Sequence, residues 1–490
     1  MSASLAARQP VLVGIGTCMQ REDDLARSRE PLDLMLQAVR RAGEDAGGSA
    51  ALAGVARIAV PRGRWRYRNP AGKIARAIGA ASATTVLASV GVLQQSLIGD
   101  ACTRIAAGEI DTALVVGGDA GYRLLRAKVA GERAPERQQD DRPMVQLEPA
   151  QELLHPAEVR AGIDLPVPLY AILESAWRAR QRWTPGEHRQ RLGAMLERFS
   201  NVAAGNPEAW RRKRFSAAEI SEPSERNPMQ AFPYTRLHCS TWSVDQAGAL
   251  LFCSAAKADA LGIPRAQWIH PWASTESNHM TAVSARAELA GCLGARLAGQ
   301  AALAAGGIDA AQLDLVELYS CFPIAVALYA HELGLPLTRD LTVTGGMPFA
   351  GGPFNNCVLQ ATCRMAQLIR DGRGRTGLVS SVSGILTKQG FGLWANEPNA
   401  AGFCFADLTA EVAQQQVTRD VVEAFHGPAQ IAGYTIAHDQ DRPRALVLAD
   451  TPGGARALAA SADPALIARM QSAEFCGEKI SVASDAFTVA

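Results

Sequence analysis

Two uncharged stretches decide the fold of this chain: AIGAASATTVLASVGVLQQSLIG at residues 77–99 and LTVTGGMPFAGGPFNNCVLQATC at residues 341–363. Each lies between charged residues and is long enough to cross a bilayer. Both, however, contain Ser, Thr, Gln or Asn side chains and central glycines, which are typical of a strand or loop that leads into a buried helix. We therefore predict no membrane span.

The two stretches are copies of one another. Val92-Leu93-Gln94 in the first reappears as Val358-Leu359-Gln360 in the second, and TALV at residues 112–115 reappears, at nearly the same offset, as TGLV at residues 376–379. Upstream, a helix and strand pattern also occurs twice, at residues 42–60 and 304–318. Recurrence of this kind indicates a duplicated core.

Each copy alternates strands and helices. In the first copy, strands are expected at residues 11–16, 58–61 and 113–116, and a buried helix begins near Gly91. Such alternation predicts a mostly parallel sheet with helices on both faces. Two halves of this kind, packed together, form an α/β five-layer sandwich of duplicated βαβαβ units.

The rest of the chain falls into an insertion and a C-terminal addition. Residues 123–244 are rich in charge and Pro and predict an inserted loop domain with helices, whereas short alternating runs after residue 400 predict a small β-rich C-terminal domain. The expected organisation is a first half at 8–122 and 245–268, the insertion at 123–244, a second half at 269–400 and the additional domain at 401–490.

Composition excludes several classes of protein. Of 490 residues, 48% are hydrophobic and 20% charged, and 49 Lys and Arg balance 48 Asp and Glu, which argues against disorder and against a nucleic-acid partner recruited by bulk charge. Ten cysteines without CxxC and eight histidines without HExxH predict neither a disulfide framework nor a metal site. No secretion signal is recognisable at the N-terminus, so we expect a cytoplasmic protein.

Two motifs in the duplicated core carry a family resemblance. ELYSCFP at residues 317–323 and GGMPFAGGPFNN at residues 345–356 make the chain similar to the thiolase superfamily, above all to sterol-carrier-protein-type thiolases and to thiolase-like proteins with an additional C-terminal domain. The resemblance implies a thiolase-type fold, coenzyme A or an acyl-CoA as ligand without a metal, and the lineage of the acetyl-CoA C-acyltransferases of lipid metabolism.

The resemblance also implies that the usual catalytic set is missing. A thiolase needs an acyl-accepting Cys, a His that activates it and a second Cys that moves the substrate proton. The matching positions in this chain are Gly91, Gly352 and Ser381. We therefore expect no standard thiolase mechanism.

Two neighbouring residues still offer reactive or hydrogen-bonding side chains at the expected catalytic site. The resemblance puts Tyr319 where the family has an oxyanion-binding His, and a phenol still donates a hydrogen bond. Cys321 is the best remaining thiol, either as an acyl acceptor or as a packed structural residue. Tyr319 and Cys321 are thus the candidate catalytic residues.

A run of cations lies in the insertion, which the resemblance identifies as the coenzyme A-binding part. Arg211, Arg212, Lys213 and Arg214 stand between two aromatic residues and could hold the nucleotide phosphates. A solvated charge run is the alternative.

Two functions from different classes remain open. The first is a protein that binds acyl-CoA thioesters in a pocket between Gly91, Tyr319, Cys321, Gly352 and Ser381, where glycines leave backbone N–H groups bare for the thioester carbonyl. The second is a non-catalytic coenzyme A-binding or assembly partner for an OB-fold protein, with the C-terminal domain providing or occupying the interface.

The resemblance finally implies an assembly. Thiolases commonly pair through the strand after the nucleophile helix, which corresponds to residues 113–116. A homodimer through this strand is therefore one expectation, and obstruction by the C-terminal domain is the other.

Overall fold

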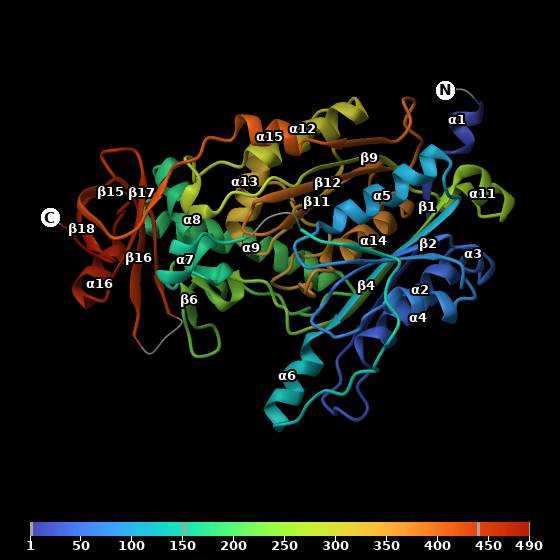
Figure 1. Cartoon of the computed structure of the whole chain (residues 1–490), viewed down its shortest axis with the longest axis horizontal. Coiled ribbons are helices and arrows are strands. Elements are labelled where there is room, and N and C mark those ends of the chain that lie inside the picture. Colours follow the sequence, from blue (N-terminus) through green and yellow to red (C-terminus); the bar gives the residue numbers. More distant parts are fainter. Residues whose placement is uncertain (1–2, 150–152, 439–441, 490) are drawn as a thin grey trace.

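The structure is a computed structural model that describes residues 3–149, 153–438 and 442–489 (Figure 1). Figure 1 shows an elongated molecule in which the C-terminal strands form a separate body at one end and the N-terminal half lies at the other. Between them, long strands and helices from both halves of the chain lie side by side. This middle region contains the candidate site.

The first sheet has six strands in the order β1-β8-β4-β2-β3-β5. Strand β2 is parallel to β3 and β4, whereas β8 is antiparallel to both β1 and β4. The strands are β1 (Pro10–Gln20), β2 (Arg57–Pro61), β3 (Thr84–Ala88), β4 (Thr112–Ala120), β5 (Val145–Leu147) and β8 (Asp245–Ser254).

The second sheet repeats this pattern in the order β10-β11-β12-β9-β13. Strand β10 is parallel to β11, and β12 is antiparallel to both β11 and β9, as β8 is to β4 and β1. Its strands are β9 (His270–Ser277), β10 (Leu315–Glu317), β11 (Thr376–Ser383), β12 (Lys388–Ala395) and β13 (Cys404–Asp407). The repeated TALV and TGLV begin β4 and β11, so the predicted duplication is confirmed.

Two helices fill the space between the sheets, α5 (Gln94–Ala107) from the first half and α14 (Cys357–Arg370) from the second. Their apolar side chains join both sheets in one buried cluster, because β4 and β8 contribute from one side and β11 and β12 from the other. Both helices begin at the repeated VLQ segments. Cys102 belongs to this central cluster and is fully buried.

Two further layers close the sandwich from outside. Helices α2 (Pro31–Asp45) and α4 (Pro70–Ala77) cover the outer face of the first sheet, and α12 (Leu293–Gly306) and α13 (Pro323–Leu333) cover that of the second. Helix α2 can lie close to β1 because Gly16 has no side chain: a Cβ there would overlap the Ala38 carbonyl oxygen. The predicted five-layer α/β sandwich is thereby confirmed.

The insertion between β4 and β8 contributes most of the remaining helices. It contains α6 (Gly121–Ala130), α7 (Pro156–Arg160), α8 (Pro166–Arg180), α9 (Pro185–Gly205), α10 (Ala217–Ser221), β6 (Met229–Ala231) and β7 (Tyr234–Thr235). Helix α9 begins at a capping box in which Thr184 and Glu187 satisfy one another's backbone N–H groups. Short helices elsewhere are α1 (Ala3–Ala7), α3 (Ala50–Ala53), α11 (Ala255–Ala260) and α15 (Thr409–Gln415).

The C-terminal strands close into a barrel. Strand β15 pairs with both β16 and β18, β16 pairs with β17, and β17 and β18 both pair with β19, so five strands form a ring. The elements are β14 (Val421–Val422), β15 (Phe425–Ala437), β16 (Arg444–Asp450), β17 (Arg456–Ser461), α16 (Pro464–Ser472), β18 (Lys479–Ser484) and β19 (Ala486–Val489). Five strands with one helix after the third make a barrel of the OB type.

Helix α8 attaches the barrel to the rest of the molecule. The buried guanidinium of Arg178 donates to the Tyr434 hydroxyl and to Glu474, both at 2.7 Å. The backbone N–H of Tyr434 donates to Ser175 Oγ at 2.8 Å. Gly433 permits this close approach, since a Cβ there would lie 3.0 Å from the carbonyl oxygen of Ile172.

The proposed dimer strand is not an edge, and that expectation is wrong. Strand β4, which contains residues 113–116, lies inside the sheet, because it pairs with β2 through residues 113–115 and with β8 along its whole length. Beyond β2 and β3, the edge is occupied by β5 from the insertion. A dimer through β4 would have to break this sheet.

No helix within the described residues is long and apolar enough to cross a membrane. The stretch at 77–99 ends in α5, and the stretch at 341–363 leads into α14. This agrees with the interpretation of both stretches as segments that enter buried helices.

Candidate functional site

A cleft of about 260 Å³ lies where the two halves and the insertion meet, and we call it the glycine cleft. Four loops and strand ends and helix α8 supply its walls, which are mainly apolar. The residues that define it are Val90, Gly91, Val167, Tyr170, Ser240, Trp242, Tyr319, Cys321, Met347, Gly352, Phe354, Val382 and Ser383. Four of the five predicted site positions therefore share one cavity: Gly91, Tyr319, Cys321 and Gly352.

Gly91 lies in the loop between β3 and α5, three residues before the helix begins. Its φ of +101° favours glycine, and a Cβ there would lie 3.0 Å from the Pro149 ring. The Gly91 carbonyl accepts a hydrogen bond from Lys388 Nζ at 2.8 Å. Backbone conformation and neighbours both exclude a nucleophilic side chain from this position.

Gly352 also lacks space for a side chain, because a Cβ there would overlap Ser240 Oγ. Its backbone N–H donates to the Thr241 carbonyl at 2.9 Å. The expectation that this N–H is free to bind a ligand is therefore wrong, because it already donates a hydrogen bond to the segment at 240–241. Gly352 also lies five residues before α14, so it is not at the helix terminus.

Ser381 does not line the glycine cleft. It lies within β11 opposite Gly390, is fully buried, and accepts a hydrogen bond from the Tyr329 hydroxyl through its backbone carbonyl. The next two residues of the strand, Val382 and Ser383, line the cleft instead.

Tyr319 lies at the back of the cleft, after β10. Its backbone N–H donates to Ser380 Oγ at 2.8 Å, which fixes the loop to β11. Burial raises the pKa of the Tyr319 phenol well above its usual value, and the neighbouring thiols of Cys357 and Cys321 add to this rise. The phenol is therefore a protonated hydrogen-bond donor at neutral pH.

Cys321 is a buried thiol in the same wall. Burial raises its pKa to about 12, although hydrogen bonds from the Tyr170 side chain and from backbone N–H groups act in the opposite direction. Its carbonyl accepts from the Ser240 N–H at 3.0 Å. At neutral pH this thiol is almost entirely protonated, which makes it a poor nucleophile.

The run at 211–214 lies outside the glycine cleft. Arg211 and Lys213 line a separate surface cavity together with Arg226 and Arg236. Lys213 pairs with Glu219 at 2.9 Å, and burial together with nearby Arg236 lowers the pKa of Arg211 to about 10. The structure thus brings this run to a different place from Gly91 and Tyr319.

The sequence pattern gave no sign of Lys388. This residue opens β12 and is almost fully buried, and its ammonium group holds the loop of Gly91 through the bond described above. Burial lowers the pKa of Lys388, whereas the nearby carboxylate of Glu276 raises it. Its contact with Gly91 joins segments far apart in the chain, so no local motif announces it.

Aromatic and cationic side chains surround the mouth of the cleft. Trp242 is 52% exposed, and the guanidinium of Arg64 lies 6.0 Å from its ring centroid and 5.9 Å from that of Phe354. Arg64 is held by an ion pair with Asp119 at 2.5 Å. These residues connect the cleft with the neighbouring surface.

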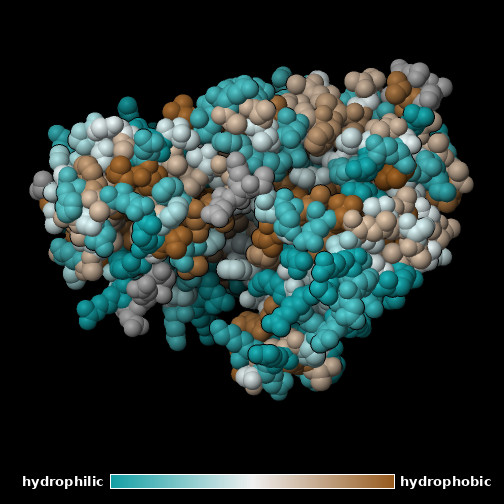
Figure 2. Space-filling model, in the orientation of Figure 1, coloured by the Kyte–Doolittle hydropathy of each residue, from teal (hydrophilic) through white to brown (hydrophobic). Residues whose placement is uncertain are grey.

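That surface is a groove lined by several cations, which we call the basic groove. Its cationic residues are Arg64, Arg66, Arg68, Lys128, Arg133 and Arg137, and its acidic ones are Glu132, Glu136 and Asp140. Figure 2 shows hydrophilic residues gathered on this lower face, over the segment around α6. Arg64 lines the basic groove and packs against Trp242 and Phe354 of the glycine cleft, so the groove lies next to the cleft mouth.

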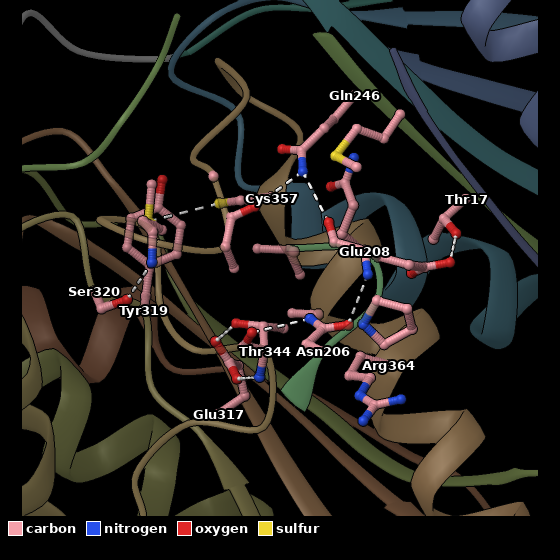
Figure 3. A pocket seen from close by; sticks show the side chains of 18 of the residues that line it. Thr17, Asn206, Glu208, Gln246, Glu317, Tyr319, Ser320, Thr344, Cys357 and Arg364 are labelled. Atoms are coloured by element: carbon pink, nitrogen blue, oxygen red, sulfur yellow. Dashed lines mark hydrogen bonds between the residues drawn. The ribbon is translucent and has the colours of Figure 1, made fainter. Parts of the chain in front are cut away.

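A second cavity of about 220 Å³, the inner chamber, lies behind the glycine cleft (Figure 3). Tyr319 and Met347 line both cavities and separate them. The chamber extends along α14 from Cys357 to Arg364, and Figure 3 shows Thr17 and Glu208 across from Tyr319. No sequence motif pointed to it.

Within the described part of the chain, no group of three or more His, Cys, Asp or Glu residues is placed to hold a metal ion. All ten cysteines are free thiols, seven of them buried.

Comparison with family models identifies the C-terminal domain of the chain. Residues 407–486 match the family model described as the thiolase-like protein type 1 additional C-terminal domain. This match covers β14 to β18 and so the larger part of the barrel. Comparison with the sequences of curated proteins found no match.

Two solved structures are similar to the chain. One is described as the crystal structure of a monomeric SCP2-thiolase like protein type 1 from Mycobacterium smegmatis, with 26% identity, a TM-score of 0.82 and 99% of each chain covered. The other is described as an Ltp2-ChsH2(DUF35) aldolase, with 18% identity, a TM-score of 0.60, 80% of this chain and 99% of that chain covered. The second likeness concerns the fold alone.

Three features agree with the comparisons: the duplicated sandwich, the cleft between its halves and the type 1 barrel. The similarity to the Mycobacterium smegmatis structure extends over practically the whole chain, barrel included. The resemblance seen in the sequence is thereby confirmed: over its whole length the chain is similar in fold to an SCP2-thiolase like protein type 1, and residues 407–486 match the type 1 additional C-terminal domain.

Proposed function

We propose that this protein binds an acyl-CoA thioester in the glycine cleft and does not form an acyl-enzyme by the Cys/His/Cys route of thiolases. The observation that carries this proposal is the shared cavity of Gly91, Tyr319 and Gly352, with mainly apolar walls and an aromatic mouth. A cleft of this kind fits the narrow pantetheine arm of coenzyme A. The phenol of Tyr319 is a donor for the thioester carbonyl.

The state of the thiols argues against covalent chemistry. Cys321 is the thiol nearest to the predicted role, and its raised pKa leaves little thiolate at neutral pH. Cys239 lines the same cleft, and burial raises its pKa as well. Catalysis by an acyl-accepting Cys321 stays a prediction that labelling can test.

For the nucleotide phosphates, we propose the basic groove rather than the run at 211–214. Arg64 of this groove packs against Trp242 and Phe354 at the mouth of the cleft, and Arg66 and Arg68 form no ion pair within the described residues. The run at 211–214 lines a cavity of its own. Guanidinium groups suit phosphate through paired hydrogen bonds.

Calorimetry with coenzyme A and with pantetheine tests both proposed sites, the glycine cleft for the pantetheine arm and the basic groove for the phosphates. Binding of both ligands to the unmodified protein supports the cleft, and absence of binding by either contradicts the proposal. In the double variant Arg66→Ala/Arg68→Ala, coenzyme A should bind at least tenfold more weakly while pantetheine binds as before. The matched control is Arg212→Ala/Arg214→Ala, two exposed arginines of the alternative run, which should change neither affinity.

Intact mass after incubation with acetyl-CoA tests the absence of covalent chemistry. We expect an unmodified mass. An added acetyl group that disappears in Cys321→Ala would instead establish Cys321 as an acyl acceptor.

A second function is assembly with a partner protein. The description of one solved structure names an aldolase assembly with a DUF35 protein, which supports a partner for chains of this fold. This chain carries its own OB-type barrel, which is fixed to helix α8. Two residues of α8, Val167 and Tyr170, line the glycine cleft. Light scattering of the purified chain, alone and with a DUF35 protein, distinguishes the roles: coenzyme A binding without association favours the first function, and association without coenzyme A binding favours the second.

A further inference from the structure

The inner chamber brings charged and amide side chains together with apolar ones such as Met347, Val358 and Ala361. Its cations are Arg41 and Arg364, Glu208 is one of its acids, and Gln246 and Gln360 are among its amides. Its inner end is formed by Tyr319 and Cys357, behind which the glycine cleft begins. Cations and amides set among apolar walls suit a small ligand that carries a polar group.

Several polar atoms in the chamber have no partner. Both amide atoms of Gln360, Oε1 of Gln246 and Nε of Arg364 are buried and make no hydrogen bond within the described residues. Gln246 is 95% buried, since only 5% of its surface is exposed. A buried polar atom without a partner destabilises the protein, so a ligand that accepts hydrogen bonds from Nε of Arg364 and Nε2 of Gln360 would recover part of that loss.

The charges in the chamber favour an anion. Arg41 and Arg364 form no ion pair within the described residues; Arg41 donates to the Thr17 carbonyl, and Arg364 donates to Gln367 at 3.3 Å. Of the two acids, Glu317 already has its carboxylate oxygens satisfied by four hydrogen bonds from residues 342–344. Glu208 is then the acid left to balance the charges of Arg41 and Arg364. One of its carboxylate oxygens accepts a hydrogen bond from Thr17 Oγ1.

We infer that the inner chamber is a binding site for a small carboxylate, which accepts hydrogen bonds from Nε of Arg364 and Nε2 of Gln360. The carboxylate has two sources: a free organic acid that enters past Arg41, or the far end of an acyl group whose thioester lies in the glycine cleft. The second source rests on the proposed acyl-CoA binding, and it is within reach because Tyr319 and Met347 line both cavities. The first source does not depend on it.

Glutarate is the probe for the free acid, and its neutral counterpart glutaramide controls for shape. Calorimetry at low ionic strength should show glutarate binding to the unmodified protein and at least tenfold weaker binding to Arg364→Met. Glutaramide should bind more weakly than glutarate to the unmodified protein. The matched control is Arg373→Met, an exposed arginine in the turn after α14, which should leave glutarate binding unchanged.

A second variant keeps the test decisive if Arg364→Met unfolds. Gln360→Leu removes two unpartnered amide atoms and has nearly the same volume, so it should retain the melting temperature and weaken glutarate binding severalfold. Glutarate affinity that is equal in the unmodified protein, Arg364→Met and Gln360→Leu would overturn the inference.

The acyl source is tested with suberyl-CoA against octanoyl-CoA, which differ at the terminal carboxylate. Tighter binding of suberyl-CoA that is lost in Arg364→Met assigns the chamber to the acyl group. If glutarate binds through Arg364 but no CoA compound binds, the chamber takes a free acid and the proposed function fails. If coenzyme A binds and neither carboxylate probe depends on Arg364, the proposed function stands and this inference fails.

Discussion

The side-chain carbonyl of Gln94 accepts a hydrogen bond from the backbone N–H of Val358 at 2.8 Å. Both residues belong to the repeated VLQ segments, so the bond joins the two copies where their central helices begin. Gln94 is almost fully buried. It therefore provides one of the first N–H groups of α14 with an acceptor that the helix itself cannot supply.

Gln94→Leu should destabilise the protein by about 1–3 kcal/mol, because the Val358 N–H would then be buried without an acceptor. Urea unfolding followed by circular dichroism measures this change. Gln415→Leu, at an exposed position of α15, serves as the control and should change stability by less than about 0.5 kcal/mol. Equal changes in unfolding free energy in the two variants would show that the hydrogen bond between Gln94 and Val358 does not stabilise the protein.

Gly352→His should not restore thiolase activity. Its Cβ would overlap Ser240 Oγ, so the segment at 240–241 must move, and we expect a loss of about 1–3 kcal/mol in unfolding free energy. Differential scanning calorimetry measures the loss. Gly205→Ala is the control, since a Cβ there meets nothing within 4 Å and should leave the melting temperature unchanged or raise it. A stable, active Gly352→His protein would contradict the assignment of this cavity wall.

Iodoacetamide should label Cys321 slowly at neutral pH. Burial raises the pKa of Cys321 to about 12 from 9.0, so the reactive thiolate is scarce and its fraction grows about tenfold per pH unit up to that value. Peptide mass mapping after timed labelling checks this, with the less buried Cys404 as the internal comparison. Preferential labelling of Cys321 at neutral pH would support a catalytic thiol.

Mild acid should destabilise the protein through His238. Burial lowers the pKa of His238 to about 3 from 6.5, because the imidazole is fully enclosed and accepts from the Thr235 N–H. The unfolded chain binds this proton first, so the contribution is fully present above pH 6.5 and is lost as the pH falls toward 3, at up to about 1.4 kcal/mol per pH unit.

Unfolding free energies measured between pH 7 and pH 4 test this dependence. His238→Asn keeps an acceptor near the Thr235 N–H but has no titrating ring, so its slope with pH should be smaller. His426→Asn, at an exposed position of the barrel, should keep the original slope. Parallel curves for all three proteins would assign the acid sensitivity to other groups.

Arg178→Met should loosen the barrel. The substitution removes the buried guanidinium from the Tyr434 hydroxyl and from Glu474, whose side chain is 26% exposed, so we expect a loss of about 1–3 kcal/mol. Calorimetry should show the barrel melting before the sandwich. Arg182→Met, on the exposed turn after the same helix, should melt like the unmodified protein. An unchanged single transition in Arg178→Met would mean that other contacts hold the barrel.

The sequence by itself determined the duplicated sandwich, because the strand and helix patterns and the repeated VLQ and TALV segments are local and survive in both copies. It also located Gly91, Tyr319, Cys321 and Gly352, since short motifs mark them, and the structure lines one cleft with all four.

Only the tertiary structure decided how these parts are used. The Gly352 N–H goes to Thr241, Lys388 holds Gly91, β4 is enclosed on both sides, and the C-terminal strands close into a barrel. The inner chamber arises from segments as distant as Thr17 and Arg364. Such contacts join residues hundreds of positions apart, and no local periodicity encodes which distant partner a polar group meets.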